Sequence, residues 1–147
     1  MSLIVRPITP DDREAWLALW RDYLTFYETV LPDSTTEITW RRLFDDAEPV
    51  HGLVAERGGE VVGIVHYIFH RSTWLETPAC YLQDLFAKQE VRGEGVGRAL
   101  IEALYAAART AGSTGVHWLT HRTNETAMRL YDRIAEKSGF IQYGHDL

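Results

Sequence analysis

The spacing of apolar residues in the first third of the chain predicts a strand followed by two helices. Residues 3–8 are expected to form the strand. Pro10 and the acidic pair after it mark a helix start, because proline fits the first helical turn and negative charge stabilises a helix N-terminus. Aromatic and leucine residues then recur at spacings of three and four as far as Tyr27, which predicts a long helix. Residues 31–34 end it, and a second short helix is expected over residues 37–44.

The middle of the chain predicts a hairpin and one further strand. Residues 53–56 and 61–69 flank the pair Gly58-Gly59, which is typical of a tight turn between antiparallel strands. The second of these strands begins with residues that are apolar on both faces, as in the centre of a sheet. The next strand is expected over residues 79–87.

The last third of the chain predicts a helix, a strand, a helix and a closing strand, over residues 97–111, 115–119, 124–137 and 140–143. Leucine and alanine side chains fall on one stripe of the first of these helices, and Gly112 ends it. The full order is β-α-α-β-β-β-α-β-α-β. A run of hairpin strands followed by β-α-β-α indicates an α/β (α+β) fold with a mixed sheet and helices on both faces.

The length and composition indicate one domain over residues 1–147. Apolar residues make up 46% and charged residues 24% of the chain, which suits a globular protein. The lone Cys80 excludes an intrachain disulfide and a multi-cysteine metal site. No apolar run is long enough to span a membrane and the N-terminus does not resemble a secretory signal, so a cytoplasmic location is expected. A net charge of −6 without a Lys/Arg cluster argues against nucleic-acid partners and is compatible with a cationic substrate.

The most informative segment is the glycine-rich run 92–98, Arg-Gly-Glu-Gly-Val-Gly-Arg, between an expected strand and an expected helix. Glycines allow a sharp turn and a close approach to a ligand, and the amides at the following helix start favour an anion. The run lacks the Gly-Lys-Ser/Thr ending of a P-loop, and Arg98 stands where a dinucleotide-binding fingerprint needs its third glycine. The loop therefore suits the pyrophosphate of a ligand that is bound by neither of these two motifs. A plain tight turn is the alternative.

This loop and the strand before it resemble the GNAT N-acetyltransferase superfamily. Arg92, Gly95 and Gly97 match the Arg/Gln-x-x-Gly-x-Gly/Ala motif of that family. Residues 81–87, Tyr-Leu-Gln-Asp-Leu-Phe-Ala, resemble the strand that precedes the motif.

The last expected helix carries a further resemblance to the same family. Asn124 is followed by Tyr131 two helical turns on, and then by Gly139-Phe140 at the entry to the expected closing strand. The chain is thus similar to GNAT enzymes over nearly its whole length. The resemblance implies the GNAT fold, with a mostly antiparallel central sheet, and acetyl-CoA as the acetyl donor. Within the superfamily the chain is most similar to polyamine and thialysine acetyltransferases and to fungal enzymes that acetylate histones and polyamines.

The resemblance implies a cofactor site built largely from the backbone. The backbone of Leu85 and Ala87 would bond the pantetheine arm, residues 93–98 would hold the pyrophosphate, and Asn124 would touch the arm. The candidate cofactor-binding residues are Leu85, Phe86, Ala87, Arg92, Gly93, Glu94, Gly95, Val96, Gly97, Arg98, Asn124 and Ala127.

Acetyl transfer to an amine needs a base for the ammonium proton and a proton donor for the thiolate leaving group. Neutralising a lysine-like amine at pH ~7.4 costs about 4 kcal/mol, so we expect a base that acts directly or through water. Asp84, flanked by apolar residues in an expected strand, is the candidate base, and a structural acid paired with an arginine is the alternative. Gln83, where some relatives carry an acid, cannot act as a base. Tyr131 is the candidate acid from its family position near the sulfur, and an inward-packed tyrosine is the alternative.

The acceptor pocket is expected to combine acids and aromatics, as in relatives of the polyamine type. The candidate substrate-binding residues are Tyr27, Glu28, Trp74, Gln83 and Asp84. Tyr27 is alternatively a core residue, and Trp74 alternatively belongs to a dimer interface.

Two pairs of histidines have the four-residue spacing of some metal sites. The pairs are His66 with His70 and His117 with His121. That spacing brings two ligands together only on a helix, whereas both pairs fall largely in expected strands. No metal is therefore predicted.

Together these features predict an acetyl-CoA-dependent N-acetyltransferase. The expected acceptor is a primary amine of a small cationic molecule, a polyamine, diamine or lysine analogue, which attacks directly in a ternary complex. A protein lysine or N-terminal acetyltransferase and a non-catalytic acetyl-CoA-binding module are the alternatives, and the presence of both Asp84 and Tyr131 argues against the module. The resemblance also implies a homodimer, and no nucleic-acid or membrane partner is expected.

Overall fold

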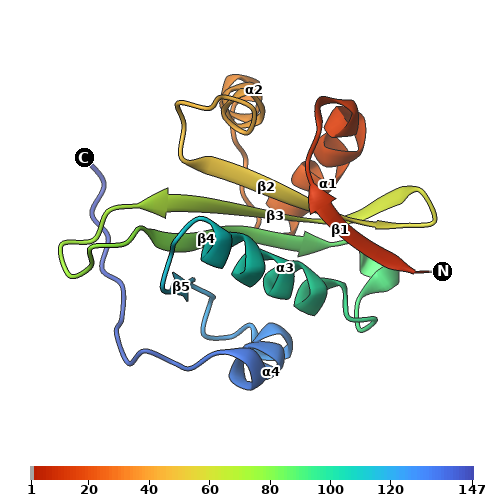
Figure 1. Ribbon diagram of the computed structural model, residues 1–147. Helices are drawn as coiled ribbons and strands as arrows, with labels where there is room; N and C mark the ends of the chain where they lie inside the picture. Colours follow the sequence, from red (N-terminus) through yellow and green to blue (C-terminus); the bar gives the residue numbers. More distant parts are fainter. Residues whose placement is uncertain (1) are drawn as a thin grey trace.

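The computed structural model describes residues 2–147, in which five strands form one sheet (Figure 1). The strands follow one another in the sheet in chain order, and all neighbours are antiparallel except β4 and β5. The strands are β1 (Leu3–Pro7), β2 (Val50–Arg57), β3 (Glu60–His70), β4 (Ala79–Ala87) and β5 (Val116–His117). The helical segments are η1 (Pro10–Asp12), α1 (Arg13–Phe26), α2 (Asp33–Arg42), η2 (Gln89–Val91), α3 (Val96–Thr110) and α4 (Glu125–Ile134).

Helices α1 and α2 lie on one side of this sheet and α3 on the other (Figure 1). The expected mixed, mostly antiparallel sheet with helices on both faces is therefore confirmed. None of the helices within residues 2–147 is both long enough and apolar enough to span a bilayer.

The second helix begins earlier than the sequence pattern predicted. It covers Asp33–Arg42 rather than residues 37–44. Pro32, with a φ of −58°, precedes the first turn, and the negative charge of Asp33 favours that turn. The segment expected to end the first helix thus also starts the second.

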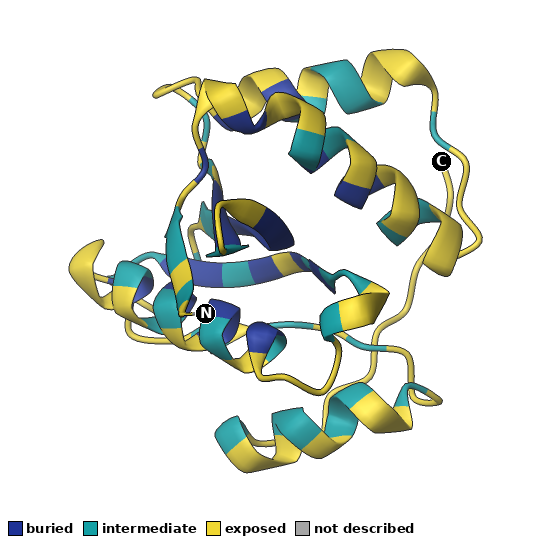
Figure 2. Ribbon diagram, turned by 90° about the vertical axis from the view of Figure 1, so that its right-hand side faces the viewer, coloured by how far each residue is buried: buried dark blue, intermediate teal, exposed yellow. Residues whose placement is uncertain are grey.

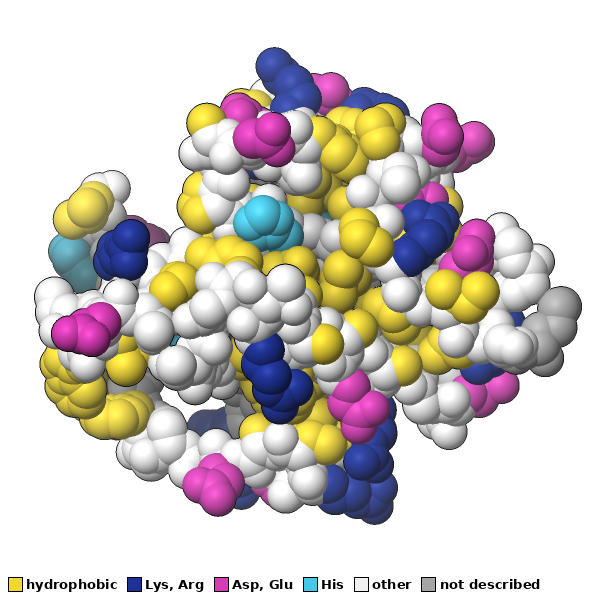
Figure 3. Space-filling view, in the orientation of Figure 1, with side chains coloured by type: hydrophobic (Ala, Val, Ile, Leu, Met, Phe, Trp, Pro, Cys, Tyr) yellow, Lys and Arg dark blue, Asp and Glu magenta, His cyan; other side chains and the backbone are white. Residues whose placement is uncertain are grey.

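The closing strand expected over residues 140–143 is wrong. Residues 135–147 contain no helix or strand, and the strand expected over residues 115–119 is reduced to Val116–His117. So short a strand offers the following chain almost no edge to pair with. Phe140 and Tyr143 consequently remain 81% and 88% exposed, and Figure 3 shows apolar side chains at its left edge, over the tail that Figure 1 draws in blue.

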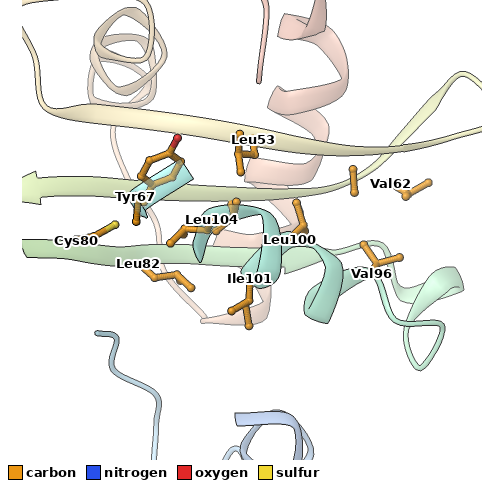
Figure 4. Close-up of a cluster of buried hydrophobic side chains, with 12 residues drawn as sticks. Leu53, Val62, Tyr67, Cys80, Leu82, Val96, Leu100, Ile101 and Leu104 are labelled. Atoms are coloured by element: carbon orange, nitrogen blue, oxygen red, sulfur yellow. The ribbon is translucent and has the colours of Figure 1, made fainter. Parts of the chain in front are cut away.

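Each face of the sheet has its own apolar core. On the α3 face, Leu100, Ile101 and Leu104 are fully buried against side chains of β3 and β4 (Figure 4). Gly63 of β3 permits the close approach of the helix, because a Cβ at this position would lie 2.9 Å from Val96 Cγ1. The core on the opposite face contains a group of packed tryptophan side chains. Trp16 stacks on Trp20 with ring centroids 5.8 Å apart, and Trp40 lies 5.0 Å from Trp16.

A β-bulge in β4 decides which of these faces Asp84 occupies. His66 and Tyr67 of β3 are paired with Asp84 and Leu82 of β4, so Gln83 is an extra residue without a partner on β3. Residues two apart on a regular strand share a face, which would place Asp84 beside Leu82 in the core under α3. The bulge instead turns Asp84 to the α1 face, next to His66.

Helix α4 covers the α3 side of the molecule only loosely. Of its described residues none is fully buried, as the absence of dark blue on this helix in Figure 2 shows. Leu130, Tyr131 and Ile134 pack against the core on the α3 face. The Tyr105 hydroxyl of α3 donates a hydrogen bond of 3.0 Å to the Ile134 carbonyl, which fixes the end of α4.

Candidate active site

A chain of hydrogen bonds crosses the α1 face of the sheet and ends on Asp84. The indole Nε1–H of Trp16 donates to Nε2 of His66 over 2.9 Å, and Nδ1 of His66 lies 3.0 Å from Oδ2 of Asp84. The Tyr23 hydroxyl donates to Oδ1 of Asp84 over 2.6 Å. His66 and Asp84 are only 2% and 8% exposed. Both oxygens of a nearly buried carboxylate are thus held in place by side chains.

The donor at one end of this chain fixes the direction of every bond in it. An indole nitrogen can only donate, so Nε2 of His66 must accept from Trp16. The imidazole proton then sits on Nδ1 and is donated to Asp84. Tyr23 also donates, so each oxygen of Asp84 accepts a hydrogen bond from one of the two neighbours.

Asp84 lines a cavity of about 490 Å³ between α1, α2 and the sheet. This volume is typical of pockets for small molecules. Aromatic and polar side chains from α1 and its C-terminal end, α2, β3 and β4 form most of the wall, among them Trp20, Tyr23, Tyr27, Thr39, Arg42, His66, Gln83 and Asp84. The cavity therefore offers an acceptor an aromatic enclosure with a carboxylate in its wall.

Two tyrosines that line this cavity, Tyr23 and Tyr27, have raised pKa values, as does Tyr131, which does not line it. Burial, followed by the charge of Asp84, raises the pKa of Tyr23 far above its usual value, and the same two causes raise the pKa of Tyr27. Burial, with a smaller contribution from Tyr27, raises the pKa of Tyr131 to about 12. All three hydroxyls keep their protons at neutral pH, so each is a donor. Tyr23 already donates to Asp84, whereas Tyr131 packs against Trp118 at a ring distance of 5.3 Å.

The start of α3 is suited to bind a phosphate group. Gly93 and Gly95 adopt φ values of 82° and 85°, which favour glycine, and a Cβ on either residue would meet nothing within 4 Å. Among residues 2–147 no side chain caps this helix, and its first turn carries no acidic residue. The first backbone N–H groups of α3 are therefore free to bind an anion in open space, which fits the pyrophosphate of acetyl-CoA.

The edge of β4 next to this loop is also open. β5 pairs with β4 only at Cys80 and Tyr81, although β4 continues to Ala87. From residue 82 onward the backbone groups on that edge have no strand beside them within the described chain. An extended pantetheine arm fits there, since it can bond to the backbone of Leu85 and Ala87 as a neighbouring strand would.

Several of the predicted cofactor residues have side chains engaged within the protein. The Arg92 guanidinium lies 5.3 Å and 5.1 Å from the ring centres of Phe26 and Phe86, and its Nε donates to the Ala87 carbonyl. Phe86 and Val96 are buried, so they offer a ligand their backbone only.

The remaining predicted cofactor residues lie at the starts of the two helices. Glu94 is paired with Arg57 over 3.2 Å, and Arg98 with Glu102 over 2.8 Å. Asn124 precedes α4 and donates to Thr120 over 3.2 Å. Gly97 lies in the first turn of α3, and Ala127 in the first turn of α4, where it is half-buried.

The structure brings only part of the predicted acceptor site together. Tyr27, Gln83 and Asp84 line the cavity, whereas Glu28 and Trp74 do not. Glu28 follows α1 in a left-handed conformation with a φ of 51° and is exposed. Trp74 lies in the loop after β3 with 85% of its surface exposed.

Residues that the sequence analysis did not assign to the catalytic or acceptor site complete it. His66, Trp16 and Tyr23 hold Asp84, and Arg42 lines the cavity. The pairing of β3 with β4 would have revealed His66, since it stands opposite Asp84, but the extra residue in β4 hides that register from the sequence. Within residues 2–147, no group of three or more His, Cys, Asp or Glu side chains lies close enough to hold a metal ion.

The chain is similar in sequence to a known protein family and to several characterised relatives. The model of the acetyltransferase (GNAT) family matches residues 14–135. The chain is 34% identical to the D-amino-acid N-acetyltransferase HPA3 of Saccharomyces cerevisiae over 143 residues, which are 96% of this chain and 89% of that protein. It is 28% identical to a thialysine N-epsilon-acetyltransferase of Caenorhabditis elegans, with 86% and 78% covered.

Solved structures support the same fold. The structure of AAC(6')-Iy in complex with the bisubstrate analogue CoA-S-monomethyl-acetylneamine superimposes with a TM-score of 0.84 at 15% identity, covering 100% of this chain and 99% of that one. The chain belongs to the GNAT acetyltransferase family. It is an acetyl-CoA-dependent N-acetyltransferase, which transfers an acetyl group to an amine.

Proposed function

We propose that the acceptor is a primary amine of a small cationic molecule, of the polyamine, diamine or lysine-analogue kind. The observation that carries the proposal is Asp84, a buried carboxylate in the wall of the cavity on the α1 face. A carboxylate at this place attracts an ammonium group and accepts its proton. The cavity volume of about 490 Å³ favours a small acceptor over a protein surface. The names of the yeast and nematode relatives state acceptors of similar size, D-amino acids and thialysine.

In the proposed reaction Asp84 prepares the nucleophile. Its carboxylate takes one proton from the acceptor ammonium, and the resulting neutral amine is the attacking group. Tyr23 and His66 keep the carboxylate in one orientation, because each donates to a different oxygen. The amine attacks the thioester carbon of bound acetyl-CoA, the tetrahedral adduct loses its second N–H proton to water, and the carbon–sulfur bond breaks to release CoA as the thiolate. Asp84 returns its proton to solvent before the next cycle.

Tyr131 is the donor that we propose for the leaving group. Burial raises the pKa of the Tyr131 hydroxyl to about 12, so the hydroxyl keeps its proton at neutral pH and is available as a hydrogen-bond donor. It donates a hydrogen bond to the departing sulfur, and the thiolate, which is a weaker base than the phenolate, takes its proton from solvent.

The test is transfer of labelled acetyl groups from acetyl-CoA to a panel of polyamines, diamines and lysine analogues, with a lysine-containing peptide as a separate arm. We expect labelled small amines and an unlabelled peptide. Label on the peptide alone would favour a protein acetyltransferase. Tight binding of acetyl-CoA without transfer to any amine would instead favour a binding module.

A further inference from the structure

The charges in the wall of the acceptor cavity do not match a polycation. Among the lining residues of the described chain, Asp84 and Arg42 are the two with carboxylate or guanidinium groups. Glu28, the other acid expected to bind an ammonium group, lies outside the cavity. A polyamine would therefore find a single carboxylate and would be repelled by Arg42.

We infer that Arg42 binds a carboxylate of the acceptor, so that the acceptor is an amino acid, or a lysine analogue with a free carboxylate, rather than a polyamine or diamine. This inference rests on the proposed function and narrows its acceptor class. A molecule with an ammonium and a carboxylate group presents each charge of the cavity with its opposite. The planar guanidinium fork is also the side chain best matched to a carboxylate.

The position of Arg42 leaves it free to take on this role. It is the last residue of α2, its side chain is 54% exposed, and its Nε lies 3.7 Å from Oε1 of Glu48. A single long contact on an exposed side chain contributes little to stability. A carboxylate that enters the cavity can thus replace Glu48 or share the guanidinium with it, without disturbing a buried ion pair.

The neighbouring arginine provides a matched control. Arg41 occupies the preceding position on α2, is 70% exposed and lies 4.0 Å from Glu37, but it does not line the cavity. Arg41→Gln removes the same charge from the same helix end without touching the cavity wall. Any effect specific to Arg42→Gln is therefore an effect of position and not of net charge.

The experiment compares acceptors that differ only by the carboxylate. We would measure kcat and KM for lysine against 1,5-diaminopentane, and for methionine against 3-(methylthio)propylamine, with both enantiomers of each amino acid. The wild-type protein is expected to prefer the amino acid of each pair. Arg42→Gln should lower kcat/KM for the amino acid roughly 10- to 100-fold, mainly through KM, and raise that for the diamine. Arg41→Gln should change neither.

The outcomes separate this inference from the proposed function. An equal fall for both members of a pair in Arg42→Gln, or a wild-type preference for the diamine, would overturn the role of Arg42 while the proposed function stands. No transfer to either member would overturn both. Thermal unfolding and acetyl-CoA binding of Arg42→Gln, both expected to match the wild type, show whether a loss comes from the fold instead.

Discussion

The cofactor side and the acceptor side of this enzyme offer their ligands different kinds of groups, from the backbone on one side and from side chains on the other. On the proposed cofactor side the candidate binding groups are backbone amides at the start of α3 and the open edge of β4, next to glycines with open space around them. On the proposed acceptor side they are side chains, of which His66 and Asp84 are nearly buried. The first kind of site tolerates changes of side chain but not of backbone conformation. The second depends on single side-chain atoms.

The largest effect is expected from Asp84→Asn on the acceptor side. The variant keeps the shape of the residue but cannot take a proton, so kcat/KM for the amine should fall roughly 10²- to 10⁴-fold. Calorimetry should find acetyl-CoA binding unchanged, because the cofactor groups lie elsewhere. Asp22→Asn, at an exposed site on α1, is the control. Full activity of Asp84→Asn would show that the base is another group.

Tyr131→Phe tests the donor between the two sides and should lower kcat about 100-fold with little change in either KM. The pKa of this tyrosine is raised to about 12, so its hydroxyl keeps its proton below that pH and loses the proton only above it. Any fall in wild-type kcat between pH 7 and pH 10 must then come from another group and should persist in the variant. Tyr105→Phe, which removes a hydroxyl bonded to Ile134, serves as control. An unchanged kcat in Tyr131→Phe would contradict the assignment.

Gly95→Ala tests the cofactor side, where backbone conformation is expected to matter more than space. A Cβ at this residue meets nothing within 4 Å, but the φ of 85° strains any residue other than glycine. KM for acetyl-CoA should rise roughly 10-fold, while KM for the amine stays unchanged. Gly97→Ala, whose Cβ would make ordinary contacts at 3.8 Å and 4.0 Å, should leave both constants near the wild type. Equal effects of the two variants on KM for acetyl-CoA would mean that the volume of the added methyl group, and not the backbone conformation, weakens cofactor binding.

Trp16→Phe is expected to have the smallest effect on rate and probes the far end of the Asp84 hydrogen-bond chain. It removes the donor to Nε2 of His66 and some packing, so urea unfolding should show a loss of about 2 kcal/mol. Without the indole donor the His66 proton can move to Nε2, and ¹⁵N chemical shifts of the ring would report this change. We expect only a few-fold fall in kcat. A retained Nδ1–H tautomer would show that Asp84 alone orients the ring.

The same contrast explains which parts of the site were predictable from sequence. Residues 92–98 form one short run, in which glycine chemistry allowed either an anion site or a plain tight turn, and the resemblance to the GNAT family favoured the anion site. The sheet, the helices on both faces and β4 followed from apolar spacing in the same way. Such features depend on residues close together in the chain, where periodicity and turn chemistry act directly.

The acceptor side was less predictable because its partners are far apart in the chain. Trp16, His66 and Asp84 come from α1, β3 and β4, and only the register of β3 with β4 brings the last two together. An extra residue shifts that register in a way that alternation alone does not reveal. The closing strand failed for a related reason, since residues 140–143 have the composition of a strand but β5 is too short to pair with them.

The extra residue Gln83 has a second consequence, for the shape of β4 itself. A bulged strand bends and twists more strongly at the insertion, and pairing with β5 stops at Tyr81, just before that point. The inserted residue thus turns the Asp84 carboxylate to the α1 face directly after the point where the pairing of β4 with β5 ends. The proposed sites for acceptor and donor therefore lie along the same stretch of β4.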